Sequence, residues 1–226
     1  MPRRVDAAVG IESPRQRKGR LAAAPVGAHL PALRSLASEC QACPLWKRAT
    51  QTVFGTGPAH APFLLVGEQP GDQEDREGAP FVGPAGRLLW KALEAAGLGR
   101  GEVYLTNAVK HFKWKATANG GKRRIHDKPS RNEVLACRPW LLAEIEAVAP
   151  ELIVCLGATA AGALLGPEFR VTQHRGEVVP SPFRAAVLAT VHPASILRAR
   201  DEASRARELD GFIRDLRAAR KLVPRH

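Results

Sequence analysis

Four continuous apolar runs recur along the chain of 226 residues. Such runs are typical of strands that are buried on both faces of a sheet. The runs lie at 62–68 (PFLLVGE), 102–110 (EVYLTNAVK), 151–157 (ELIVCLG) and 185–193 (AAVLATVHP). We therefore predict four buried strands, with a turn-rich segment at 172–179 before the last of them.

Stretches with helical signals alternate with these runs. Gly97 is placed to close one helix, and Ser130 with Glu133 has the S-x-x-E spacing of a capping box that starts another. The predicted helices span 83–97, Ser130 to about Val148, 158–166 and about Glu202 to Lys221. Because strands alternate with helices, we predict a three-layer α/β/α sandwich around a central, mainly parallel four-stranded sheet.

Polar residues follow three of the predicted strands. They are Gly67-Glu68-Gln69 after the first, Asn107 after the second and His192 after the fourth. Any one of them would commonly do no more than cap a turn or a helix. In a parallel sheet, however, ligands bind beyond the carboxyl ends of the strands. The coincidence of three such groups therefore indicates a pocket at this edge.

The chain is strongly basic. It carries 34 Lys and Arg against 22 Asp and Glu, which gives a formal charge of +12 and a pI of about 10.3. This charge favours a polyanionic partner, with nucleic acid ahead of an anionic membrane. The alternative is that the positive net charge is spread over the surface and only aids solubility. No apolar run is long enough to cross a bilayer and no signal-peptide core is present, so we expect a cytoplasmic, nucleoid-associated protein.

The first 28 residues differ from the rest. They are rich in Arg, Pro and Ala and show no sustained periodicity. We predict a disordered basic arm at 1–28, followed by one domain at 29–226.

Four cysteines are dispersed along the chain. Cys40 and Cys43 form a C-x-x-C pair, whereas Cys137 lies in a predicted helix and Cys155 near the end of a predicted strand. In a reducing compartment such cysteines are more often metal ligands or free thiols than disulfides. Their dispersion favours an iron–sulfur cluster over a structural zinc, whose ligands usually come from two compact knuckles, and free thiols are the third alternative.

Several motifs together resemble the iron–sulfur uracil-DNA glycosylases. They are GEQPG at 67–71, GAPFVGPAGRLL at 78–89, LTNAVK at 105–110, VHPASILR at 191–198 and the four cysteines. GEQPG, with glutamine third, and KRRIH at 122–126 resemble the X class of this family (UdgX). The resemblance covers nearly all of residues 36–198. One departure is HPAS, where the family has serine directly after proline, so Ser195 is the hydroxyl expected to contact DNA.

The resemblance implies an iron–sulfur cluster and a pocket for a uracil that is flipped out of DNA. The implied ligands of a [4Fe-4S] cluster are Cys40, Cys43, Cys137 and Cys155. The residues implied to bind the base are Gly67, Gly71, Phe81 and Asn107. Phe81 would stack on uracil, the amide of Asn107 would pair with its Watson–Crick edge, and His192 would stabilise the charge on departing uracil.

The resemblance to the X class also implies that the histidine of the KRRIH loop attacks the sugar. His126 would bind C1′ covalently after uracil leaves, so that the protein reacts once. Glu68 would accept or orient its proton, and Gln69 would hold its ring. The implied phosphate clamps of the loop are Lys122, Arg123 and Arg124.

The implied partners are uracil and uracil-containing DNA, preferably single-stranded, bound by a monomeric protein. Two other functions stay open. One is a conventional multiple-turnover glycosylase in which Glu68 activates water. The other is a non-catalytic iron–sulfur module that binds single strands, although the few aromatic residues, mostly in core-like contexts, speak against it.

Overall fold

The computed structural model describes residues 24–25, 27–117 and 123–224. In these residues, a five-stranded sheet has the strand order β2-β1-β5-β7-β6. The strands are β1 (Phe63–Gly67), β2 (Val103–Asn107), β5 (Leu152–Leu156), β6 (Val178–Val179) and β7 (Ala186–Thr190). The strands β2, β1, β5 and β7 are parallel to one another, and β6 runs antiparallel to β7. The predicted parallel sheet is confirmed, with β6 as an added edge strand in the segment predicted to be turns.

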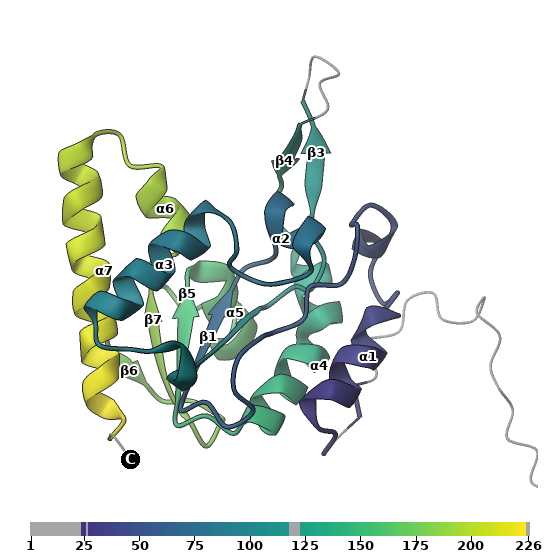
Figure 1. The fold of residues 1–226 in the computed structure, drawn as a ribbon, viewed down its shortest axis with the longest axis horizontal. Helices are drawn as coiled ribbons and strands as arrows, with labels where there is room; N and C mark the ends of the chain where they lie inside the picture. Colours follow the sequence, from purple (N-terminus) through teal and green to yellow (C-terminus); the bar gives the residue numbers. More distant parts are fainter. Residues whose placement is uncertain (1–23, 26, 118–122, 225–226) are drawn as a thin grey trace, which may run out of the picture.

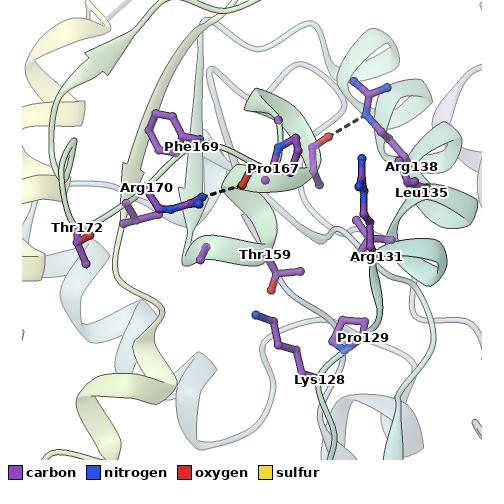
Figure 2. Close-up of a pocket in the computed structure, with 16 residues that line it drawn as sticks. Lys128, Pro129, Arg131, Leu135, Arg138, Thr159, Pro167, Phe169, Arg170 and Thr172 are labelled. Atoms are coloured by element: carbon purple, nitrogen blue, oxygen red, sulfur yellow. Dashed lines mark hydrogen bonds between the residues drawn. The ribbon is translucent and has the colours of Figure 1, made fainter.

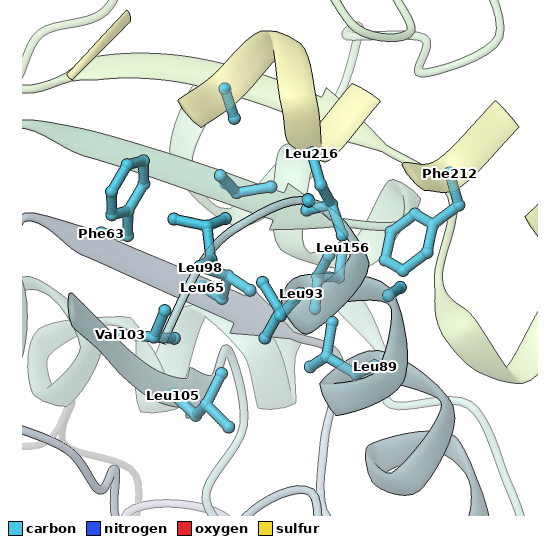
Figure 3. Packing of buried hydrophobic residues seen from close by; sticks show 14 of the residues in the cluster. Phe63, Leu65, Leu89, Leu93, Leu98, Val103, Leu105, Leu156, Phe212 and Leu216 are labelled. Carbon is cyan, nitrogen blue, oxygen red and sulfur yellow. The ribbon is translucent and has the colours of Figure 1, made fainter. Parts of the chain in front are cut away.

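Helices cover both faces of the sheet (Figure 1). On one face lie α3 (Pro84–Ala95), α6 (Pro193–Leu197) and α7 (Glu202–Leu222). On the other face lie α4 (Arg131–Val148) and α5 (Ala158–Leu165), with α1 (Leu30–Ser38) packed against α4. Figure 3 shows the first of these cores, where Leu65 of β1 faces Leu93 of α3 and Leu216 of α7. The predicted three-layer α/β/α class is therefore confirmed.

Local signals explain where the helices begin and end. Gly97 adopts a φ of 77°, which stops α3. Ser130 Oγ accepts the N–H of Glu133, so α4 starts as the capping box predicts. Five helices of the described residues were not expected from the sequence: α1 and α6, and the short elements η2 (Pro44–Lys47), α2 (Asp72–Glu77) and η3 (Arg100–Glu102). Among the described residues, no helix combines the length and the apolar character that a membrane span requires.

The segment that carries His126 is a β-hairpin, not the extended loop that the sequence suggested. β3 (Trp114–Ala116) pairs antiparallel with β4 (Arg124–His126), and Trp114 lies opposite His126. The hairpin projects beyond the carboxyl edge of the sheet (Figure 1). Because strand pairing fixes the register, His126 has a defined place at the base of the hairpin.

The sheet has its topological switch point between β1 and β5. The chain continues from β1 to β2 on one side, whereas β5 lies on the other side of β1. In open α/β sheets, ligand sites form at this point, beyond the carboxyl ends of the strands. Glu68 follows β1, Thr159 lies in the first turn after β5, and their side chains are hydrogen-bonded across this point.

Candidate active site at the carboxyl edge of the sheet

Gly67, Phe81 and Asn107 lie against one another at the end of β1. A Cβ atom on Gly67 would lie 2.3 Å from Oδ1 of Asn107 and 2.7 Å from Cζ of Phe81. Glycine is therefore required if the amide and the ring are to approach the strand this closely. In the described part of the chain, no hydrogen bond engages the side-chain amide of Asn107, although its backbone carbonyl is bonded. A free amide beside an aromatic ring suits a planar base with hydrogen-bonding edges.

The segment that carries Phe81 is held by a buried glutamate. The carboxylate of Glu74 accepts the N–H of Gly71 at 3.0 Å and the N–H of Gly83 at 2.8 Å. Phe81 itself has a φ of 58°, which residues other than glycine seldom adopt. Gly71 is the N-cap of α2, and its N–H is one of the two groups that Glu74 binds.

A buried ion pair supports the backbone of Asn107. The ammonium of Lys110 donates to the carbonyl of Asn107 at 2.8 Å and is ion-paired with Glu144. The side chains of Lys110 and Glu144 are 1% and 0% exposed. Glu144 also accepts hydrogen bonds from Gly55 N at 2.8 Å, Tyr104 Oη at 3.1 Å and Thr106 Oγ1 at 2.8 Å. A charge pair with this many partners is satisfied without water and keeps the end of β2 rigid.

His192 is oriented as a hydrogen-bond donor. It is the N-cap of α6, and its Nδ1 accepts the N–H of Ala194 at 3.1 Å. Burial lowers the pKa of His192 to about 4, so the ring is neutral at pH 7. A neutral ring whose Nδ1 accepts must carry its proton on Nε2. The ring also stacks with Phe81 at 6.3 Å between centroids, which brings this donor beside the aromatic ring.

His126 and Glu68 meet at the switch point. Nε2 of His126 lies 3.5 Å from Oε1 of Glu68, and the other carboxylate oxygen of Glu68 accepts a hydrogen bond from Thr159. Burial lowers the pKa of His126 below 6.5, and the charge of Glu68 partly opposes this shift. The imidazole is thus mainly neutral at pH 7 while its side chain remains 48% exposed. A neutral, accessible imidazole beside a carboxylate can act as a nucleophile or as a base.

Gln69 holds the backbone on both sides of the hairpin. Its Nε2 donates to the carbonyls of Lys113 at 3.1 Å and Asp127 at 3.0 Å, and its Oε1 accepts the N–H of Lys113 at 3.1 Å. Lys113 precedes β3 and Asp127 follows His126. The sequence predicted that Gln69 holds the ring of His126; in the structure it fixes the backbone that carries the ring.

Arg124 is engaged within the protein. Its guanidinium donates to Asp75 at 2.6 Å and also to Asp72, and its side chain is 13% exposed. Asp75 is fully buried at the side chain. The predicted phosphate clamp is therefore corrected, because two carboxylates of α2 occupy the guanidinium and tie the hairpin to that helix.

The other predicted DNA contacts are less constrained. Arg123 is exposed, and Lys122 lies outside the described residues. Ser195 is exposed, and its hydroxyl donates to the carbonyl of His192 at 2.7 Å within α6.

Three of the four cysteines gather between α1 and α4. Cys40, Cys43 and Cys137 belong to one cluster, together with Leu33 and Ala37 of α1. Burial raises the pKa of Cys137 to about 12, with smaller raising effects from Cys43 and Cys40, as expected for neighbouring thiols. In the described part of the chain, no three His, Cys, Asp or Glu side chains are arranged to hold a single metal ion. This finding applies to single metal ions only, because the thiolates that bind an iron–sulfur cluster are spread around several metal atoms.

Cys155 is separate from these three. It lies in β5 opposite Val66 of β1 and Ala189 of β7, and its side chain is 0% exposed. It belongs to the core between the sheet and α4, together with Leu141 and Ile145 of that helix. Burial is the sole cause that raises its pKa to about 12. The prediction that Cys155 completes the ligand set is corrected, because its position in the central strand points it into a different core.

His111 is a buried residue near the three cysteines that the sequence did not single out. It follows Lys110, whose N–H donates to Sγ of Cys137 at 3.2 Å. Thr52 Oγ1 donates to the carbonyl of Ala37 at 3.1 Å and lies 2.9 Å from Nε2 of His111. A hydroxyl has one proton, so Nε2 of His111 must donate and Nδ1 carries the free lone pair. The sequence signal was a histidine next to the LTNAVK motif.

Comparisons with known proteins show the family of the chain. The family model described as the uracil DNA glycosylase superfamily matches residues 54–217. The type-4 uracil-DNA glycosylase of Thermotoga maritima is 37% identical over 163 residues, which cover 72% of this chain and 80% of that protein. The type-4 uracil-DNA glycosylase of Pyrobaculum aerophilum is 35% identical over 173 residues, covering 74% and 83%. The crystal structure of Pedobacter heparinus SMUG2 gives a TM-score of 0.46 at 16% identity, covering 72% and 77%. The chain belongs to the uracil-DNA glycosylase superfamily.

Proposed function

We propose that the protein excises uracil from DNA and is then captured on C1′ of the abasic sugar through His126. The observation that carries this proposal is the contact between Nε2 of His126 and Oε1 of Glu68, 3.5 Å long, at the switch point of the sheet. The names of the related enzymes support the substrate, because they are uracil-DNA glycosylases. The KRRIH sequence of the hairpin supports the capture step.

In the proposed complex, the flipped uracil lies between Phe81 and the free amide of Asn107. The amide offers both a donor and an acceptor, which the Watson–Crick edge of uracil complements. Nε2–H of His192 donates to the uracil as it gains negative charge. Phe81 supplies the stacking face.

The proposed capture step conserves atoms and electrons. The C1′–N1 bond breaks, and its electron pair leaves with uracil. The Nε2 proton of His126 passes to Glu68, and the lone pair that remains on Nε2 forms the new bond to C1′. The product is a protein–DNA adduct, so one molecule of protein reacts with one uracil.

The alternative is that water attacks C1′, with Glu68 as general base and His126 as a DNA contact. A denaturing gel distinguishes the two reactions with a single-stranded uracil oligonucleotide, and thymine in place of uracil is the control. Capture gives a band that resists denaturation, whereas water attack gives free abasic DNA beyond one equivalent of protein. If neither product forms, the protein is a binding module without catalysis.

The Asn107→Ala variant is expected to weaken uracil recognition by about 1–3 kcal/mol, because it leaves the polar edge of a buried base unpaired. The measurement is the rate of reaction with uracil DNA at subsaturating protein. Asn132→Ala, at an exposed position of α4, is the matched control and should react like the wild type. An unchanged rate in Asn107→Ala would remove Asn107 from the base site.

The capture rate is expected to rise with pH through the pKa of His126 and to level off below neutral pH. Only the neutral imidazole reacts, and burial lowers its pKa below 6.5. Among the charges around it, Glu68 and Asp127 raise this pKa and Arg198 lowers it. Glu68→Gln should therefore move the acid limb to lower pH, besides slowing capture, and Arg198→Gln should move it to higher pH. Single-turnover rates measured across the pH range test this, and shifts in the same direction for both variants would contradict it.

We further propose that Cys40, Cys43 and Cys137 hold a [4Fe-4S] cluster, with Nδ1 of His111 as the fourth ligand. The three thiols share one cluster of side chains, and the proton on Nε2 of His111 leaves Nδ1 free to bind iron. When bound, such a cluster would brace the packing of α1 against α4. The chemistry on the uracil does not pass through it.

His111→Ala and Cys137→Ala are expected to lose iron, whereas Cys155→Ala should keep it. The first two remove proposed ligands, and the third alters a buried strand residue in a different core. Iron content and visible absorption after anaerobic purification measure this. Iron loss in Cys155→Ala with full iron in His111→Ala would restore Cys155 to the ligand set.

A further inference from the structure

A groove lies beside the candidate active site and belongs to none of the roles described so far. It has a volume of about 660 Å³ and runs between the first turns of α4, the helix α5 and the segment 166–172. In Figure 2, Arg131 and Arg138 line one side, Phe169 and Arg170 line the other, and Thr159 lies between them. Its volume is in the range of sites that bind ligands.

The charge of the groove is positive. Its cationic lining residues are Lys128, Arg131, Arg138 and Arg170, and no Asp or Glu of the described residues lines it. Arg138 and Arg170 each donate to a backbone carbonyl, which leaves most of their N–H groups free. Arg170 also lies 3.5 Å from Glu168, whose side chain is 91% exposed, so that pair is weak. The groove is therefore prepared for an anion.

The groove also has an apolar surface. Leu135 lines it and is 44% exposed, which is high for a large apolar side chain. Phe169 and Val171 line the opposite side. Alternating charge and apolar surface is complementary to a single strand, in which phosphates and base faces alternate.

The groove is continuous with the candidate active site. Thr159 lines it and donates to the carboxylate of Glu68. Lys128 lies two residues after His126 and points toward Thr159 in Figure 2. A strand with its uridine at Glu68 would therefore pass directly into the groove.

We propose that this groove binds the single-stranded DNA segment on one side of the flipped uridine. The proposal rests on the proposed function and adds a subsite to it. Arg131 and Arg170 contact phosphates of the flanking nucleotides, and Leu135 with Phe169 contacts a flanking base.

The test measures equilibrium binding, which does not depend on capture. The probe is a fluorescent single-stranded oligonucleotide with one 2′-fluoro-2′-deoxyuridine, whose glycosidic bond resists cleavage. Three versions carry flanks on both sides, on the 5′ side only or on the 3′ side only. The variants are Arg131→Gln with Arg170→Gln, and Arg205→Gln on the exposed surface of α7 as the control.

The double variant is expected to bind the two-flank probe at least about tenfold more weakly at low salt. The slope of log K against log salt should fall by about 1.4, because each lost phosphate contact on a single strand contributes about 0.7. One truncated probe should be bound equally by the wild type and the double variant. The flank that this probe lacks is the flank that lies in the groove. The proposal would be overturned if, for each of the three probes, the double variant bound as tightly as the wild type at every salt concentration. The groove would then belong to another ligand. That result would not affect the uracil reaction, whose failure is seen separately as the absence of any product with uracil DNA.

Discussion

His126→Ala is expected to abolish the denaturation-resistant protein–DNA adduct while the variant still releases uracil. The groups assigned to the base, Phe81, Asn107 and His192, come from other elements and do not depend on the imidazole. Removing the ring leaves space next to Glu68, where water can enter and attack C1′ instead. The variant should therefore turn over more than once and accumulate free abasic DNA.

The measurement is a denaturing gel with quantification of released uracil. His60→Ala is the matched control, because His60 is exposed and precedes β1 at the opposite end of the strand. The control should form the adduct at the wild-type rate. An adduct that persists in His126→Ala would assign the nucleophile to another residue.

Lys110→Met is expected to lower the free energy of unfolding by about 3–5 kcal/mol, the cost of leaving one buried charge without its partner. Glu144 would remain ionised or take up a proton at 0% exposure, with only neutral donors around it. Urea denaturation measures the loss. The same variant should also react more slowly with uracil DNA, since Lys110 donates to the carbonyl of Asn107.

Arg76→Met is the control for this prediction. Arg76 pairs with Asp72 at 3.0 Å, but its side chain is 64% exposed, so the pair contributes at most about 1 kcal/mol. A loss below that value in Lys110→Met would mean that the buried network does not hold the end of β2.

The core of the fold could be predicted from the sequence because its strands are buried on both faces. β1, β2 and β5 are buried at every residue, which gives the continuous apolar runs. The hairpin could not be predicted in this way. Its strands are three residues long and half-exposed, and their pairing depends on the contacts of Gln69 with Lys113 and Asp127, distant in sequence.

The candidate site was predicted where a residue's place follows from the end of a strand, as for Glu68 and Asn107. Partners that come from other elements were missed. Thr159 and the carboxylates that hold Arg124 are polar residues without a motif, and tertiary packing brings them together. Cys155 was included in the predicted ligand set only because it is a cysteine. The sequence does not show toward which core a residue of a buried strand points.

The most direct test of the account is to map the adduct formed with single-stranded uracil DNA. After nuclease and trypsin digestion, the modified residue should lie in the peptide 125–131, since trypsin cleaves after Arg124 and not between Lys128 and Pro129. We expect a sugar-phosphate remnant on His126 and one equivalent of uracil released per adduct. A remnant on a different peptide, or free abasic DNA in excess of protein with no adduct, would contradict the account.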